Sequence, residues 1–150
     1  MGGGQRSLSA PFDGVYRMHV TAASVAKHDQ VPLAEATQEN YGDFVLVIDR
    51  GRFAITQENK NACTWAYGKA ALKGSELDWD FTDGGGIAPT HAQNKPGEYF
   101  VWRWSLYRQV LTLRPIRPTD LTVQRWQRTS STPSKGALSD RCPPPKEALP

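Results

Sequence analysis

Short segments in which apolar and polar residues alternate, each followed by a turn, cover most of this 150-residue chain. Alternation with a period of two places successive side chains on opposite faces, so it indicates half-buried strands. The pattern predicts eight strands, over residues 12–21, 43–49, 53–57, 63–72, 76–82, 98–107, 110–114 and 121–128. Short turns join most of them, among them Arg50-Gly51 and Lys73-Gly74, and the glycine run at residues 84–86 is expected to follow the fifth strand as a loop. One short helix is expected over residues 22–28, with Thr21 as its N-cap.

Eight antiparallel strands in sequential hairpins close readily into a barrel, which removes exposed sheet edges. The expected fold is therefore all-β: an eight-stranded antiparallel up-and-down β-barrel with one short helix after the first strand. A β-sandwich is the alternative, but the short sequential turns favour up-and-down order. The barrel is assigned to residues 12–129, preceded by a flexible segment at 1–11. A proline-rich tail, residues 130–150, is expected to pack on the barrel.

Charge and motif content exclude several classes of function. Lys and Arg number 18 against 15 Asp and Glu, and the basic residues do not run together, so nucleic acid is not an expected partner. No stretch reaches the roughly 18 apolar residues of a membrane span. His19, His28 and His91 lack the spacing of metal ligands. Neither a metal nor a cofactor is expected, and the oligomeric state is left open.

Aromatic residues are the best candidates for a site. Trp65 and Tyr67, Trp79 and Phe81, and Trp102 and Trp104 form three pairs on successive strands. These rings either fill the core or form a flat wall for a ligand, and both interpretations stay open. Six rings on three strands exceed what packing alone requires, and a flat wall suits a flat ligand. Which strand face points inward is open. If the opposite face of residues 98–107 points inward, then Arg103 and Tyr107 supply polar anchors for the ligand.

The two cysteines, Cys63 and Cys142, allow two interpretations. They are either two buried free thiols or one disulfide that pins the tail to the barrel. The proline-rich surroundings of Cys142 are unusual for a buried core thiol. A disulfide would place the protein in an oxidising compartment, extracytoplasmic or secreted, whereas unpaired thiols would fit the cytoplasm.

Several segments together resemble the calycin superfamily of lipocalin-like barrels. They are residues 14–17, the helix that follows, residues 63–68 and 77–81, and residues 104–113 and 125–128. In lipocalins a Gly-x-Trp motif packs under a basic residue and plugs the closed end. The resemblance implies that Gly14-Val15-Tyr16 takes the first role in this chain, and that Arg125 or Arg128 takes the second. The family's Thr-Asp-Tyr motif has no match at the corresponding place. The resemblance implies a carrier of small hydrophobic molecules, and it also supports a tie between the tail and a barrel strand.

Two functions that use a cavity remain, beside a structural or interaction domain with a solid core. The first is binding of a small apolar or aromatic molecule in the barrel cavity, with residues 22–40 and 87–97 at its mouth. The second is cofactor-independent cyclase or isomerase chemistry, of a pericyclase-like kind, on a polyketide-like substrate in the same cavity. Tyr16, Tyr67, Arg103 and Tyr107 are the catalytic candidates. The residues do not decide between binding and catalysis.

Overall fold

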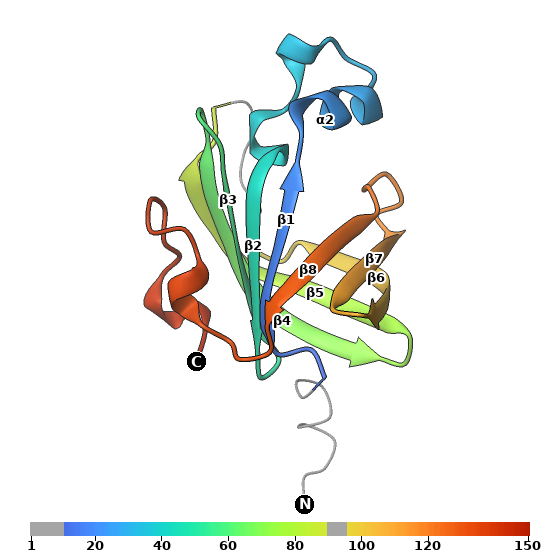
Figure 1. Ribbon diagram of the computed structural model, residues 1–150, viewed down its shortest axis with the longest axis vertical. Helices are drawn as coiled ribbons and strands as arrows, with labels where there is room; N and C mark the ends of the chain where they lie inside the picture. Colours follow the sequence, from blue (N-terminus) through green and yellow to red (C-terminus); the bar gives the residue numbers. More distant parts are fainter. Residues whose placement is uncertain (1–10, 90–95) are drawn as a thin grey trace, which may run out of the picture.

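Each strand of the sheet pairs antiparallel with its neighbours in the sequence, and the last strand returns to pair with the first (Figure 1). The structure, a computed structural model, describes residues 11–89 and 96–150. The strands are β1 (Gly14–Val20), β2 (Gly42–Asp49), β3 (Arg52–Glu58), β4 (Cys63–Lys73), β5 (Glu76–Ile87), β6 (Tyr99–Tyr107), β7 (Val110–Arg117) and β8 (Gln124–Ser130). The predicted up-and-down barrel is therefore confirmed.

The predicted helix is confirmed as α2 (Ala22–Asp29), which follows β1 at one end of the barrel (Figure 1). Thr21 caps it, because its hydroxyl accepts a hydrogen bond from the amide of Ser24 at 3.1 Å. Two short 3₁₀ turns, η1 (Leu33–Glu35) and η2 (Gln38–Asn40), lead from α2 into β2. Val25 and Ala26 of the helix pack with Ala36, so this segment forms a small apolar cluster of its own.

The inward faces of the strands meet in one apolar cluster that draws on all eight strands. Its largest fully buried side chains are aromatic, and they include Trp79, Trp102 and Trp126. Burying a large ring removes much apolar surface from water, and these three residues therefore contribute much of the core's stabilisation.

The C-terminal tail lies on the outer face of β2, β3 and β4 (Figure 1). It contains the turns η3 (Lys135–Ala137) and η4 (Lys146–Ala148). Leu138, Ala148 and Leu149 are buried there against the barrel wall. Cys63 of β4 and Cys142 of the tail form a disulfide, which confirms the second interpretation of the two cysteines.

The glycine run at residues 84–86 does not leave the sheet, contrary to the prediction. It continues β5 and pairs with residues 64–66 of β4. The physical reason is the Trp65 ring, which covers Gly85 so closely that an added Cβ would lie 2.5 Å from its Cζ2 atom. Gly86, at φ = +106°, takes a backbone conformation that side chains rarely adopt. These glycines therefore make room for a ring within the sheet.

Tyr16 and Arg128 close the end of the barrel opposite α2. They are partners in the β1–β8 ladder, and the Tyr16 hydroxyl donates to the carbonyl of Phe12 at 2.6 Å. Burial raises the pKa of Tyr16, and the neighbouring Arg128 offsets this only in part. Arg128, and not Arg125, occupies this position, because Arg125 lies one residue before the inward-facing Trp126 and therefore points outward.

Asp78 on the outer face of β5 is a buried carboxylate with two partners. Its Oδ2 atom accepts from the Tyr99 hydroxyl at 2.6 Å and lies 3.0 Å from the Lys73 ammonium. Burial alone would raise the pKa of Asp78, but these two partners outweigh it and lower the pKa below its usual value of 3.8.

This arrangement predicts a pH dependence. Since the pKa of Asp78 is lower in the folded chain, the carboxylate stabilises the fold above its unfolded pKa, and this contribution is lost as the pH falls through the folded pKa. Urea unfolding between pH 2 and 5 should therefore show a weaker loss of stability in Asp78→Asn than in the wild type. Asp80→Asn removes an exposed carboxylate of the same strand and serves as the control. Equal pH dependence in the wild type and Asp78→Asn would contradict this assignment.

Candidate functional site

Trp79, Phe81, Trp102 and Trp104 are brought together, all on the inward faces of β5 and β6. The first three are at most 2% exposed, and Trp104 is half-buried near the closed end, 4.5 Å from the Phe12 ring. Trp79 stacks on Phe53 with ring centres 5.1 Å apart and meets Trp102 edge-on at 5.3 Å. These residues therefore pack mainly on one another.

The indole N–H groups of Trp79 and Trp102 are buried, and no residue of the described ranges accepts a hydrogen bond from them. A buried donor without a partner is uncommon and costs about 1–3 kcal/mol. The two rings thus combine dense apolar packing with unused hydrogen-bonding capacity in the middle of the barrel.

Trp65 and Tyr67 do not join this group, so the expectation of six rings on one wall is wrong for these two. They stack on each other with centres 5.9 Å apart, on the outer face of β4 beneath the tail. The reason is strand parity: Ala66, between them, points into the barrel, and so its neighbours point out. Burial raises the pKa of Tyr67, and the nearby Glu147 of the tail adds to this.

Arg103 and Tyr107 lie on the outer face of β6 and are exposed, Tyr107 to 68%. Of the other catalytic candidates, Tyr16 is hydrogen-bonded at the closed end and Tyr67 lies under the tail. The four groups put forward for cyclase or isomerase chemistry therefore lie in three separate places: Tyr16 at the closed end, Tyr67 under the tail, and Arg103 with Tyr107 on the outer face of β6. His91 and most of the loop at 87–97 fall outside the described residues.

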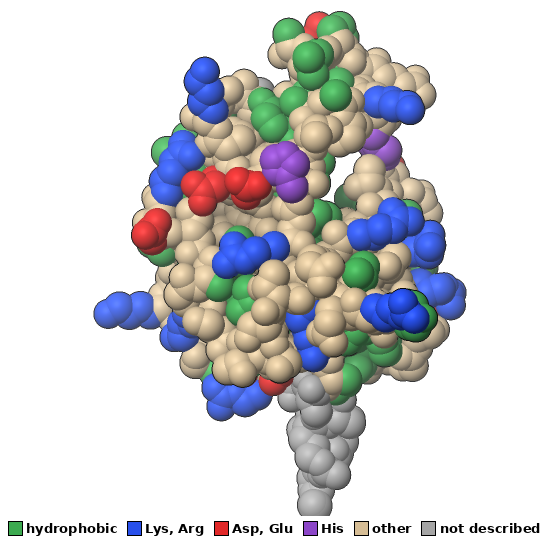
Figure 2. Space-filling model, viewed as in Figure 1, with side chains coloured by type: hydrophobic (Ala, Val, Ile, Leu, Met, Phe, Trp, Pro, Cys, Tyr) green, Lys and Arg blue, Asp and Glu red, His purple; other side chains and the backbone are tan. Residues whose placement is uncertain are grey.

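A cleft of about 690 Å³ opens at the helix end of the barrel instead. It exists because the ladder between β1 and β8 is short: it joins residues 15–17 to residues 127–130 and then stops. Above Arg17 the two strands diverge, as Figure 1 shows, and α2 covers the top of the gap. Figure 2 shows the molecule hollowed below the helix, between the two purple histidine side chains.

The floor and sides of this cleft are apolar. Met18 of β1 and Phe44 of β2 are half-buried there, together with Leu121 from the β7–β8 connection. Val25 of α2 and Val123 complete the apolar lining. Phe44 meets the buried Trp126 ring edge-on at 6.3 Å, so the floor rests directly on the barrel core.

The rim of the cleft is polar. His19 Nδ1 lies 2.8 Å from Asp43 Oδ1, and His28 Nδ1 lies 3.0 Å from Asp29 Oδ1. Gln124 accepts a hydrogen bond from the Trp126 indole at 2.9 Å, and Arg125 stands beside it. An apolar floor with a few polar groups around the entrance is typical of sites for small molecules.

The cleft residues were missed in the sequence, apart from the expectation that residues 22–40 border the mouth. His19 and His28 carry no signal of a binding role in the sequence. Along residues 11–89 and 96–150, no group of three or more His, Cys, Asp or Glu side chains is placed to hold a metal. Met18 and Phe44 occupy the alternate positions of their strands whose side chains point into the barrel. This alternation is the one feature of the sequence that could have indicated them.

Comparisons with models of protein families, with curated proteins and with solved structures find no match to this chain. Across the described residues, no helix is both long and apolar enough to cross a bilayer. The fold and the cleft define a closed eight-stranded barrel with a lateral opening.

Proposed function

We propose that this protein binds a small apolar or aromatic molecule in the cleft between β1 and β8. The observation that carries the proposal is the gap in the β1–β8 ladder, which exposes the apolar residues Met18, Phe44 and Leu121 at the end of an otherwise packed barrel. The volume of about 690 Å³ lies within the range of small-molecule sites. The site is displaced from the ring wall expected from the sequence, because those rings fill the barrel.

Each part of the cleft has a role in this proposal. The side chains of Met18 and Phe44 provide apolar contact with the body of the ligand. The rim, with His19, His28 and Gln124, offers hydrogen bonds to a polar substituent. Binding gains from water released from the apolar floor, so affinity should follow the apolar area that the ligand buries.

The disulfide supports an extracytoplasmic or secreted setting, because disulfides persist in oxidising compartments. A lipocalin-like carrier fits this setting and the barrel. The ligand itself is left as a chemical class: one apolar or aromatic body with at least one polar group.

Binding of the neutral aromatic dye N-phenyl-1-naphthylamine tests the proposal. We expect saturable binding to one site. Phe44→Ala and Leu121→Gln should each weaken it by about tenfold, the effect of losing much of one buried apolar side chain. Quenching of tryptophan fluorescence should accompany binding, since Trp126 lies beneath Phe44.

Leu33→Ala is the matched control, because Leu33 is 62% exposed and lies outside the cleft. Thermal unfolding of each variant verifies that the barrel is intact. If Phe44→Ala does not fold, Leu121→Gln still tests the site, because Leu121 is only half-buried and lies in the connection between β7 and β8. A wild-type protein that does not bind the dye, or cleft variants that bind like Leu33→Ala, would refute the proposed site.

A further inference from the structure

Four arginines form a continuous stripe across the outer wall of the barrel. The ladder pairs Arg17 of β1 with Gln127 of β8, two residues from Arg125. Arg125 is in turn the ladder partner of Thr112 on β7, and Arg114 follows Thr112 by two residues on the same face of β7. Arg114 then lies directly opposite Arg103 of β6. Diagonal neighbours in a sheet lie about 7–8 Å apart and direct partners about 5 Å apart, so the stripe is about 20 Å long.

All four side chains point outward and are exposed. None of them forms an ion pair with another residue of the described ranges, and the one hydrogen bond of the set joins Arg103 to the Ser75 hydroxyl at 3.4 Å. Glu76 is the ladder partner of Arg103 on β5 and marks the acidic end of the stripe. In Figure 2, several Lys and Arg side chains lie on the side of the molecule where β7 and β8 are drawn, and others lie on the opposite side.

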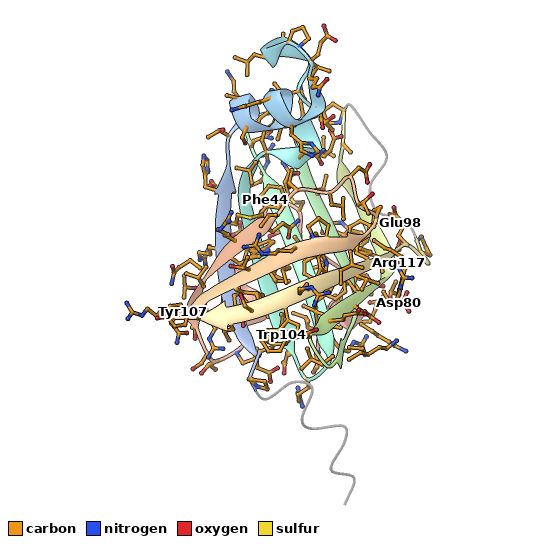
Figure 3. The ribbon with its side chains drawn as sticks, turned by 90° about the vertical axis from the view of Figure 1, so that its right-hand side faces the viewer. Phe44, Asp80, Glu98, Trp104, Tyr107 and Arg117 are labelled. Atoms are coloured by element: carbon orange, nitrogen blue, oxygen red, sulfur yellow. A yellow bond between two sulfur atoms is a disulfide. The ribbon has the colours of Figure 1, made fainter. Side chains whose placement is uncertain are left out.

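Arg103 and Arg114 are opposed across the ladder at a cost to the fold. Like charges directly opposite each other in a sheet are destabilising. The adjoining β6–β7 turn carries a further cost, because Arg108 and Gln109 both have positive φ, at 51° and 65°, where glycine or asparagine is favoured. Arg108 lies over the exposed Tyr107 ring at 5.3 Å. Figure 3 turns this face toward the viewer, with Tyr107 and Arg117 near its two sides.

We propose that this stripe binds a linear acidic polysaccharide. Guanidinium groups pair with carboxylate and sulfate through two parallel hydrogen bonds, and four of them in line match the repeated anionic groups of such a chain. The outward residues beside the stripe, Ser105, Thr112 and Gln127, can hydrogen-bond sugar hydroxyls.

Two other polyanions fit this wall less well. A flat anionic bilayer would need several apolar side chains to insert along the stripe, but Ser105, Thr112 and Gln127 beside it are polar and the exposed Val123 and Tyr107 lie apart at opposite sides. Single-stranded nucleic acid is normally held by aromatic rings on which bases stack, and no ring lies between these arginines on the outer face. A thin chain that follows a convex wall is the better match.

Binding to heparin, a sulfated polysaccharide, and to polygalacturonate, a carboxylated one, tests the inference. The variant Arg103→Gln/Arg114→Gln lies outside the cleft and removes two charges from the stripe. We expect its Kd for heparin to rise at least tenfold, with a shallower dependence of binding on salt. Its thermal stability should be unchanged or higher, because the opposed charges are gone.

Lys60→Gln/Lys146→Gln is the control, since it removes the same charge from exposed positions elsewhere. It should bind heparin like the wild type. The inference is overturned if both double variants weaken binding equally, if the wild type binds neither polysaccharide at physiological salt, or if a 20-base DNA or phosphatidylglycerol vesicles bind more tightly than heparin. Because the test leaves the cleft intact, its failure does not affect the proposed small-molecule site.

Discussion

Replacing both cysteines by alanine, as Cys63→Ala/Cys142→Ala, is expected to lower the free energy of unfolding by about 4 kcal/mol. The disulfide joins residues 79 positions apart, so it closes a loop of more than half the chain. A cross-link over such a loop stabilises mainly by restricting the unfolded chain, and its contribution grows slowly with loop length. Urea unfolding of the variant and of the oxidised wild type, followed by circular dichroism, measures the difference.

The barrel itself should still form in this variant. The tail keeps contacts that do not involve sulfur: the Ser139 amide donates to the Thr56 hydroxyl at 3.0 Å, and Arg141 donates to the Asn59 carbonyl at 2.6 Å. We therefore expect a folded protein with a tail more open to proteolysis than in the wild type. The reduced wild type should behave like the double variant. A loss of less than about 1 kcal/mol would show that the unfolded chain is already restricted in another way.

The alternation that predicts the strands also explains why their faces could not be assigned. On β4, Trp65 and Tyr67 alternate with Ala66 and Gly68, and neither face is polar. The tail packs against Trp65 and Tyr67 on the outer face of this part of the strand, so the contrast between inside and outside is absent there, whereas Lys69 and Lys73 farther along the same face stay exposed. On β7 and β8, the outer residues include the exposed Arg114 and Arg125, and the inner residues include Leu113 and Trp126, so the two faces differ clearly in polarity there.

The cleft could not be predicted for a different reason. It depends on where the ladder between β1 and β8 ends, at Arg17 and Gln127, and this follows from the angle between two strands more than a hundred residues apart. Residues 18–20 and 124–126 have ordinary strand patterns that do not reveal the divergence. Gly85 is a similar case, because a side chain at this position would collide with the Trp65 ring on the neighbouring strand. The local sequence pattern thus predicts the strands and their order. Where the barrel closes, and where its ladder is interrupted, depends on contacts between residues far apart in the sequence.

Trp79→Ala is expected to lower the free energy of unfolding by about 3–5 kcal/mol, because a ring in full contact with Phe53, Phe81 and Trp102 is replaced by a cavity. Tyr107→Ala, at a ring 68% exposed, should change it by no more than about 0.5 kcal/mol. Trp79→Phe keeps a ring in place and removes the unpartnered indole N–H, so its loss should be well below that of Trp79→Ala. Urea unfolding of the three variants gives these differences directly.

The same variant distinguishes a filled barrel from a barrel with internal room. If the interior is packed as the ring contacts indicate, the alanine variant contains an apolar cavity, and added indole or benzene should bind there and recover part of the lost stability. In the wild type, indole or benzene should stabilise the fold only by binding in the β1–β8 cleft. The single variant Phe44→Ala, which weakens the cleft and keeps Trp79, measures how much of the stabilisation comes from that cleft. A small loss in Trp79→Ala, together with stabilisation of the Phe44→Ala variant by the same compounds, would mean that the interior already holds space around Trp79. The cleft would then be the entrance to a deeper site lined by Trp79 and Trp102, and their two unpartnered indole N–H groups would become the donors that meet the ligand.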